Sequence, residues 1–285
     1  MMAQNQIGEQ IREHLLPQCF NAAVKAGAAI MKIYQNKDDY DISLKSDKTP
    51  ITMADRVAHN TIKEILGPTR VPVLSEEGRE MLYGERRNWE FFFLVDPLDG
   101  TVEFINGTNE FTVNIALLAD NECVASVLYV PYYHKMYLAL KGKGAYLVRD
   151  IIPDENPSFN RKDIESRVER LPLADNGHTG FKVAISRSHQ TPDTHERINQ
   201  IKALHPDLEV IEQGSSYKFC MLAEGKIDYY IRTTNTYEWD TAAGELILAE
   251  AGGSTLSYPE GKPLLYNKED LKNPWFEACG HNCKK

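Results

Sequence analysis

The 285-residue sequence contains no uninterrupted apolar run near the ~20 residues that a helix needs to cross a bilayer. Residues 1–14 also lack an apolar stretch of the secretory type, because Glu9, Arg12 and Glu13 fall within them. We therefore expect a cytoplasmic protein without a transmembrane segment. Loose attachment to the inner surface of the membrane stays open, as does the oligomeric state.

Cysteine is scarce, and its five positions are spread over the whole chain: Cys19, Cys123, Cys220, Cys279 and Cys283. An odd and scattered set argues against a disulfide framework. Cys279 and Cys283 flank His281, which leaves a zinc site open as one interpretation. Three candidate ligands at the end of a chain fall short of the usual four. We therefore favour a loose tail with free thiols.

Positive charge is also in short supply, because 32 lysines and arginines face 41 aspartates and glutamates, for a net charge of -9. The densest basic run, at 161–170, is interleaved with Asp163, Glu165 and Glu169 and is typical of a solvated helix face. An acidic chain without a basic patch repels nucleic acid, so we expect no such partner. A phosphorylated substrate would require bound divalent cations to reverse the local charge.

Hydrophobic residues make up 42% of the sequence, enough for a substantial core in one large or two moderate domains. Apolar periodicity predicts one helix that begins near Pro17 and another over 52–66. Apolar runs predict strands at 91–95, 111–119, 123–129, 136–140 and 144–148. After the polar stretch 150–180, strands and helices alternate at 181–185, 191–204, 209–211, 216–224, 229–232 and 241–251. We infer an N-terminal α+β domain over 1–155 and a C-terminal α/β domain over 156–285.

An acidic motif lies directly behind the predicted strand at 91–95 and consists of Asp96-Pro97-Leu98-Asp99-Gly100-Thr101. A tight turn there would aim the carboxylates of Asp96 and Asp99 and the Leu98 carbonyl at one point. Hard divalent cations prefer such oxygen ligands. Gly100 permits close approach of a ligand, and free N–H groups of a helix that begins at Thr101 would face an anion. A turn that merely begins a helix is the alternative.

Two further motifs strengthen the case for chemistry. The sequence Leu-Ser-Glu-Glu-Gly at 74–78 places two adjacent carboxylates behind an apolar segment, where they repel each other unless a cation or solvent separates them. The sequence Trp-Asp-Thr-Ala-Ala-Gly at 239–244 places Asp240 as the N-cap of a helix whose small residues permit close packing. Taken alone, the first is compatible with a solvated loop and the second with capping only.

In this order, the three motifs resemble the inositol monophosphatase superfamily of lithium-sensitive, Mg²⁺-dependent phosphatases, and the resemblance extends over nearly the whole chain. Within it the sequence is most similar to the CysQ branch, the 3'(2'),5'-bisphosphate nucleotidases. Typical monophosphatases have Thr-Asn-Phe where this chain has Val-Glu-Phe at 102–104. Tyr217 stands where a smaller aliphatic residue is common in the branch, which leaves a change in base contacts open. The other matching segments are 110–117, 186–189, 214–220 and 223–225.

The resemblance implies a layered αβαβα sandwich with the site between its two parts. It also implies two Mg²⁺ ions. One is bound by Glu76, Asp96 and the Leu98 carbonyl, and the other by Asp96, Asp99 and Asp240. The four carboxylates carry a formal charge of about -4, which two Mg²⁺ ions neutralise.

The resemblance further assigns the catalytic step to a water that the first metal activates, without a covalent phosphoenzyme. Asp55 and Thr101 resemble the pair that orients or deprotonates this water, with Glu76 and Glu77 as further candidates. The N–H groups of Gly100 and Thr101 would hold phosphoryl oxygens. A third, weaker metal at Glu76, with Asp55 nearby, stays open.

On the substrate side, the residues that resemble those of the branch are Ser188, His189, Ser216, Lys218 and Arg232, beside Leu98, Asp99, Gly100, Thr101 and Asp240. We expect Lys218 and Arg232 to meet the remaining phosphate. Each has an ordinary alternative, because a lone Lys or Arg is most often solvated and His189 could cap the helix that follows.

The implied reaction is hydrolysis of adenosine 3',5'-bisphosphate to AMP and phosphate, with 3'-phosphoadenylyl sulfate as a related substrate, in sulfur metabolism. An inositol or sugar monophosphatase with the same metals is one alternative, and the segments 186–189 and 214–218 favour the nucleotidase. A non-catalytic regulatory or nucleic-acid-binding protein of the same fold is another, although every expected metal ligand is present. A structural Mg²⁺ or Ca²⁺ module does not explain Asp55 and Thr101.

Overall fold

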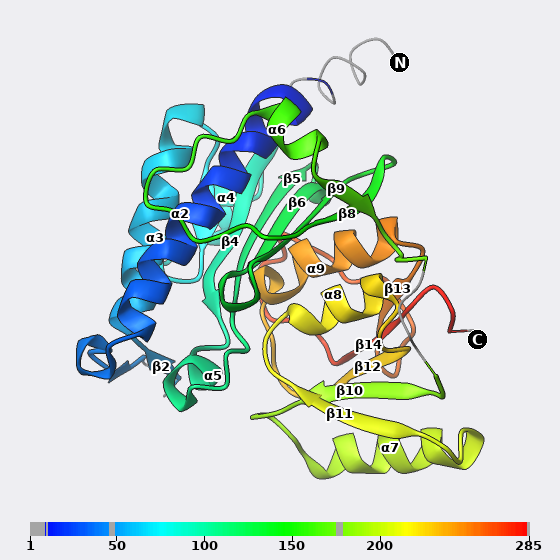
Figure 1. Ribbon diagram of the computed structural model, residues 1–285. Helices are drawn as coiled ribbons and strands as arrows, with labels where there is room; N and C mark the ends of the chain where they lie inside the picture. Colours follow the sequence, from blue (N-terminus) through cyan, green and yellow to red (C-terminus); the bar gives the residue numbers. More distant parts are fainter. Residues whose placement is uncertain (1–8, 10, 46–48, 175–178, 284–285) are drawn as a thin grey trace.

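Five layers of helices and strands make up the part of the chain that the computed structural model describes (Figure 1). That part comprises residues 9, 11–45, 49–174 and 179–283. Two long helices, α2 (Leu16–Tyr34) and α3 (Met53–Leu66), lie side by side and cover one face of a seven-stranded sheet. The other face is covered by α8 (Tyr217–Glu224) and α9 (Glu238–Glu250).

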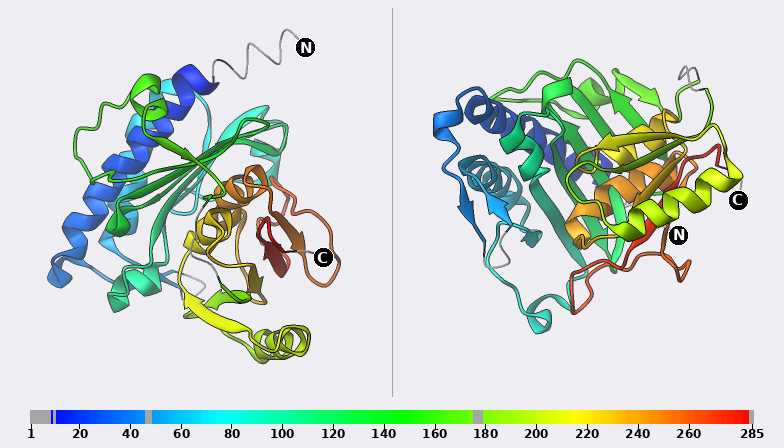
Figure 2. Two further views of the ribbon diagram at one scale, coloured as in Figure 1. Left: turned by 45° about the vertical axis from the view of Figure 1, so that its right-hand side comes forward. Right: turned by 90° about the horizontal axis from the view of Figure 1, so that it is seen from below.

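A five-stranded sheet lies on the far side of α8 and α9, and α7 (Pro192–Leu204) packs on its outer face through Ile198 and Ile201. Figure 2 shows the two sheets separated by α8 and α9, with α7 outermost. This arrangement is the layered αβαβα sandwich that the sequence predicts, and the fold prediction is confirmed. None of the helices in the described ranges has the length and hydrophobicity that a membrane crossing requires.

The seven-stranded sheet follows chain order, with β3 parallel to β4 and every other neighbouring pair antiparallel. Its strands are β3 (Val73–Ser75), β4 (Phe91–Asp99), β5 (Thr112–Ala119), β6 (Glu122–Val130), β7 (Lys135–Leu140), β8 (Gly144–Val148) and β9 (Val168–Arg170). Helices cover both faces of β4 and β5, which explains their nearly continuous apolar sequences. The strands predicted between 111 and 148 are confirmed.

The five-stranded sheet has the order β11-β10-β12-β14-β13, parallel among the first three strands and antiparallel around β14. Its strands are β10 (Lys182–Ser186), β11 (Glu209–Gln213), β12 (Tyr229–Arg232), β13 (Ser254–Ser257) and β14 (Phe276–Cys279). The sequence does not predict β13 and β14. The predicted loose tail is wrong for Cys279, which pairs with both neighbouring strands because Phe276 and Ala278 fill the core.

Short elements connect the layers. They are the hairpin strands β1 (Ser43–Leu44) and β2 (Pro50–Ile51), the helices α4 (Tyr83–Arg86), α5 (Thr101–Asn106) and α6 (Arg161–Glu165), a π-helical turn at Ile11–Leu15, and 3₁₀ turns at Lys37–Asp39, Gly67–Thr69 and Pro131–Tyr133. α6 packs on α2, and β9 pairs with β8. The larger sheet therefore extends past the predicted boundary at 155/156, and the division into two domains stays a prediction.

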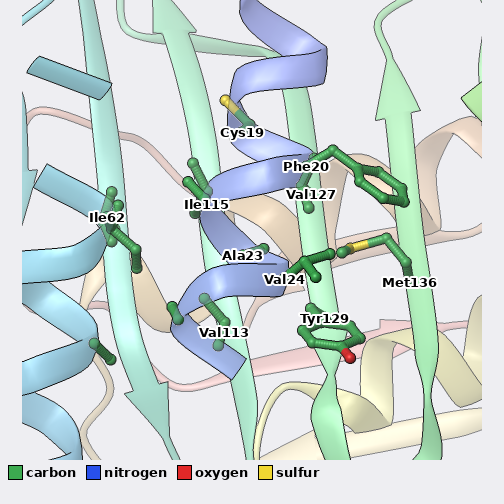
Figure 3. Close-up of a cluster of buried hydrophobic side chains, with 14 of the residues drawn as sticks. Cys19, Phe20, Ala23, Val24, Ile62, Val113, Ile115, Val127, Tyr129 and Met136 are labelled. Atoms are coloured by element: carbon green, nitrogen blue, oxygen red, sulfur yellow. The ribbon is translucent and has the colours of Figure 1, made fainter. Parts of the chain in front are cut away.

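Small residues bring α2 close to the larger sheet (Figure 3). Ala23 and Val24 face the side chains of β5 and β6. A Cβ atom at Gly27 would lie 2.4 Å from Cε1 of Tyr129, so this position has no room for a side chain. The Tyr129 hydroxyl in turn donates to the Ile151 carbonyl at 2.6 Å. This packing fixes the sheet whose strand β4 carries the acidic motif.

The acidic motif differs from its predicted form, because β4 continues through it instead of ending in a tight turn. Asp96 pairs with Asn114 and Asp99 with Thr112, so two residues of β4 oppose one of β5 in a bulge. Pro97 has no N–H to donate to β5. The bulge places Pro97 where the regular pairing of the two strands is interrupted, so no hydrogen bond of the ladder is lost there. The bulge turns the end of β4 toward α5.

Candidate active site

A cavity of about 180 Å³ lies where the end of β4, the start of α5 and the start of α9 meet β12 and α8. Residues of both sheets thus line it, and the position of the site between two domains stays a prediction. Most of the predicted site residues line it: Glu76, Asp96, Leu98, Asp99, Gly100, Thr101, His189, Ser216, Lys218, Arg232 and Asp240. Asp55, Glu77 and Ser188 lie outside its lining and contact residues that form or adjoin it.

Three carboxylates gather at one end of this cavity. One oxygen each of Glu76, Asp96 and Asp240 lies within 4.8 Å of the others. Burial, followed by the charges of Glu76 and Asp99, holds the pKa of Asp96 well above its ordinary value. Burial and the charge of Asp99 do the same to the pKa of Asp240. Carboxylates that repel one another away from water are the donor set that a hard divalent cation requires, so these residues fit Mg²⁺.

Asp240 reaches the cluster from the first turn of α9 and does not act as its N-cap, which corrects the prediction. The helix begins at Glu238 after an N-cap at Tyr237. The Oδ2 atom of Asp240 accepts the Tyr237 N–H at 2.8 Å. A carboxylate at the third helical position satisfies an otherwise unpaired N–H in this way. One oxygen of Asp240 therefore fixes the side chain, and the other is available to the cluster.

Asp99 is held by the start of α8. Its Oδ2 atom accepts the Ser216 N–H at 2.5 Å and also the Ser216 hydroxyl. The same hydroxyl lies 2.7 Å from the Asp240 carbonyl and 3.0 Å from Asn114 Nδ2. Ser216, predicted on the substrate side, thus connects β4, β5, α8 and α9. The role of Asp99 as a metal ligand stays a prediction, because Asp99 is outside the cluster of three.

The predicted pair of Asp55 and Thr101 is brought together across 46 residues of sequence. The Thr101 hydroxyl donates to Asp55 Oδ1 at 2.9 Å. Thr52, which the sequence analysis does not identify, donates its N–H and its hydroxyl to Asp55 Oδ2 at 2.7 and 2.6 Å. Burial raises the pKa of Asp55 although these donors oppose it. Asp55 is therefore fixed in orientation and largely removed from water, while Thr101 lines the cavity.

Lys45 is a site residue that the sequence does not reveal. Its Nζ atom donates to Glu76 Oε1 at 2.6 Å and also to Glu77 Oε1. Burial lowers the pKa of Lys45, but the charges of Glu76 and Glu77 and the hydrogen bonds to them together outweigh burial, so that the pKa is raised overall. Lys45 lies 31 residues before Glu76 in a polar segment, and no motif connects the two. A cation that binds Glu76 must compete with this ammonium group.

Lys218 and Arg232 are cationic residues in the lining of the same cavity. Lys218 is fully buried and donates to the carbonyls of Gln213 and Ser215 at 2.8 and 2.7 Å. Burial, followed by the charge of Arg232, lowers the pKa of Lys218 to about 8. Arg232 donates to the Asn235 carbonyl at 3.2 Å. The alternative that Lys218 is an ordinary solvated lysine is wrong.

His189 and Ser188 lie beside these cations. The N-cap of α7 is Thr191, so the alternative that His189 caps this helix is wrong. Burial, followed by Arg232, lowers the pKa of His189, which favours a neutral ring near pH 7. The Ser188 hydroxyl donates to Glu103 Oε1 at 2.7 Å.

Tyr217 points away from the cavity. Its ring lies 5.6 Å from that of Tyr133, and its hydroxyl accepts from Lys135 at 3.3 Å. The side chain is 8% exposed and belongs to the interface between α8 and β7. It therefore contributes to packing on β7 and does not reach a ligand in the cavity.

The Cys279-His281-Cys283 segment forms no metal cluster with other described residues, since the only such group in the described ranges is the set of three carboxylates. None of the five cysteines forms a disulfide bond.

Comparison with curated proteins gives relatives over almost the entire chain. The 3'(2'),5'-bisphosphate nucleotidase CysQ of Escherichia coli is 38% identical over 270 residues, which cover 93% of this chain and 99% of the relative. The Haemophilus influenzae protein of the same name is 32% identical over 274 residues, which cover 95% and 94% of the two chains.

Comparison with solved structures gives relatives of the same kind over almost the whole chain. CysQ from Bacteroides thetaiotaomicron, described as a bacterial member of the inositol monophosphatase family, matches with a TM-score of 0.84 and 44% identity over 93% of this chain and 97% of its own. The extragenic suppressor protein SuhB of Bartonella henselae matches with a TM-score of 0.72 and 25% identity over 94% of both chains. The inositol monophosphatase family model itself covers residues 12–275. With the sandwich fold, the acidic cluster and these matches, the chain belongs to the inositol monophosphatase family.

Proposed function

We propose that this protein is a Mg²⁺-dependent 3'(2'),5'-bisphosphate nucleotidase that converts adenosine 3',5'-bisphosphate to AMP and phosphate, and that it also acts on 3'-phosphoadenylyl sulfate. The observation that carries the proposal is a cavity whose lining combines the three clustered carboxylates with the buried Lys218 and the half-buried Arg232. A substrate with two phosphate groups fits such a site. The names of the relatives support the same substrate class.

In this proposal Glu76, Asp96 and Asp240 hold Mg²⁺, together with Asp99 and the Leu98 carbonyl. Two ions are proposed, because two neutralise the four carboxylates, and a third near Glu76 would have to displace Lys45. When bound, Mg²⁺ neutralises the site for an anionic substrate and supplies the Lewis acid that activates a water for attack on phosphorus.

The residues of the chain position the reactants and handle the proton. Thr101 Oγ1 donates to Asp55 Oδ1 and accepts a proton from the attacking water, so that a proton moves from the water to Thr101 as Thr101 releases its own to Asp55. The raised pKa of Asp55 makes it a stronger base than an exposed aspartate. Glu77 is held by Lys45 near this pair and has a supporting role.

The phosphate groups are bound from two directions. The N–H groups of Gly100 and Thr101, at the start of α5, hold oxygens of the phosphate that is cleaved. Lys218 and Arg232 bind the phosphate that is retained, and His189 lies next to them. We also propose a cytoplasmic location, with the site between an N-terminal and a C-terminal domain.

The test measures phosphate release with Mg²⁺ from adenosine 3',5'-bisphosphate and from inositol 1-phosphate, each with and without Li⁺. Preference for the nucleotide, dependence on Mg²⁺ and inhibition by Li⁺ support the proposal. Preference for the inositol ester would leave the metal site standing and refute the assignment of Lys218 and Arg232. Failure to release phosphate from either substrate would refute the catalytic proposal.

A further inference from the structure

Glu103 is a carboxylate of the cavity that the proposed reaction does not use. It lies on α5, is only 3% exposed and lines the same cavity as the acidic cluster and Lys218. Its Oε1 atom accepts the Ser188 hydroxyl at 2.7 Å. Within the described ranges, no residue donates a hydrogen bond to the other oxygen, Oε2, and no cationic nitrogen pairs with it. Because Oε2 is not one of the fully buried unpaired polar atoms, it is open to the cavity and can accept a hydrogen bond from a ligand there.

The surrounding backbone holds Glu103 in this position. A Cβ atom at Gly214 would lie 2.4 Å from Glu103 Cγ and 2.8 Å from its Cδ, so the glycine leaves the space that the carboxylate occupies. Gly214 is itself fixed, because its N–H donates to Glu110 Oε2 at 2.8 Å. Glu110 also binds Arg187 through both of its oxygens. Glu103 therefore has little freedom to turn away from the cavity.

Glu103 and Ser188 can only accept further hydrogen bonds, because neither has a proton left to donate. The Ser188 hydroxyl donates its single proton to Glu103, so its oxygen has only lone pairs left for other partners. Glu103 Oε2 is likewise an acceptor. A phosphate oxygen offers no donor to this corner and is repelled by the carboxylate. A sugar hydroxyl or an exocyclic amine offers the donor that both groups lack.

We propose that Glu103, held by Ser188 and Gly214, determines specificity by accepting a hydrogen bond from a hydroxyl or amine of the nucleoside part of the substrate. This inference rests on the proposed nucleotidase function. It places the nucleoside between the acidic cluster and the two cations. Glu103 then contacts a hydroxyl or amine that phosphate esters without a nucleoside do not offer at that position.

The experiment compares kcat/KM for three substrates with Mg²⁺: adenosine 3',5'-bisphosphate, its 2'-deoxy analogue and inosine 3',5'-bisphosphate. The deoxy analogue lacks the hydroxyl, and the inosine analogue has a carbonyl in place of the amine. We expect the wild type to lose about 10- to 100-fold in kcat/KM on the analogue that lacks the recognised donor, as for a hydrogen bond to a charged group. The analogue with the lower kcat/KM identifies the group that donates to Glu103.

The variant Glu103→Gln sharpens the test. Its amide oxygen keeps the bond from Ser188, so its NH₂ group takes the place of Oε2 and turns an acceptor into a donor. The preference for the natural substrate should therefore disappear or reverse in Glu103→Gln. The matched control is Glu110→Gln, which alters a carboxylate that contacts the same Gly214 loop outside the cavity lining. It should change kcat/KM for all three substrates by the same factor.

Two results would overturn the inference while the nucleotidase function stands. One is equal kcat/KM of the wild type for all three substrates. The other is a uniform loss in Glu103→Gln, which would show that Glu103 only supports the loop. Failure of the wild type to hydrolyse any of the three would overturn the proposed function and this inference with it.

Discussion

Replacing Lys218 by methionine removes a charge that the folded protein holds away from water. Burial, followed by the charge of Arg232, lowers the pKa of Lys218 from its ordinary value of 10.5 to about 8. This shift corresponds to about 3 kcal/mol of destabilisation of the folded state by the charged ammonium, at 1.36 kcal/mol per pKa unit. The variant also loses two hydrogen bonds to carbonyls, so the informative quantity is the change of the stability difference with pH.

The sign of that change follows from proton binding. Between pH 8 and 10.5 the unfolded chain keeps the Lys218 proton while the folded protein releases it, so the stability of the wild type rises with pH. Relative to Lys218→Met, the wild type should gain about 1.4 kcal/mol between pH 7 and pH 9, and about 2.5 kcal/mol by pH 10.

Urea unfolding of both proteins at pH 7, 8, 9 and 10 measures this difference, in which the titration of all shared groups cancels. A stability difference that does not vary with pH would show that Lys218 keeps an ordinary pKa, and would refute the description of Lys218 as a desolvated ammonium group.

The remaining predictions concern the acidic cluster and the packing beneath it. Asp96→Asn should nearly abolish phosphate release while circular dichroism shows an intact fold; near-normal activity would refute the ligand assignment. Lys45→Met should bind Mg²⁺ more tightly in calorimetry, because the ammonium no longer competes for Glu76, whereas unchanged affinity would show that Lys45 does not obstruct the cation. Gly27→Ala should lose about 1–3 kcal/mol in urea unfolding, because its Cβ overlaps the Tyr129 ring; an unchanged unfolding midpoint would contradict the close packing of α2.

Local sequence patterns identify the three carboxylates that the structure brings together. The apolar run before Asp96 identifies β4, and acidic residues that follow a buried strand are placed together by the sheet. The pair of Asp55 and Thr101 depends on a contact across 46 residues, which no local pattern encodes and which only the family resemblance supplies.

Other features depend on the tertiary arrangement and escape local reasoning. A carboxylate at the N-cap cannot be told from one at the third helical position by sequence, and Tyr237 is not a residue type that marks an N-cap. The predicted start of α9 is therefore wrong by three positions at Asp240. The short strand β14 has only two inward-facing residues, Phe276 and Ala278, too few for a clear alternation. Lys45 is recognisable only once the hairpin of β1 and β2 is placed beside Glu76.

The central claim is that this site removes one phosphate of a nucleotide bisphosphate and retains the other. Phosphorus NMR of the products formed from adenosine 3',5'-bisphosphate in the presence of Mg²⁺ tests it most directly. The account predicts inorganic phosphate and 5'-AMP in equal amounts, because it assigns the cleaved phosphate to the N–H groups of Gly100 and Thr101 beside the Mg²⁺ site and the other phosphate to Lys218 and Arg232. Release of 3'-AMP, or of adenosine with both phosphates removed, would contradict this division of the cavity.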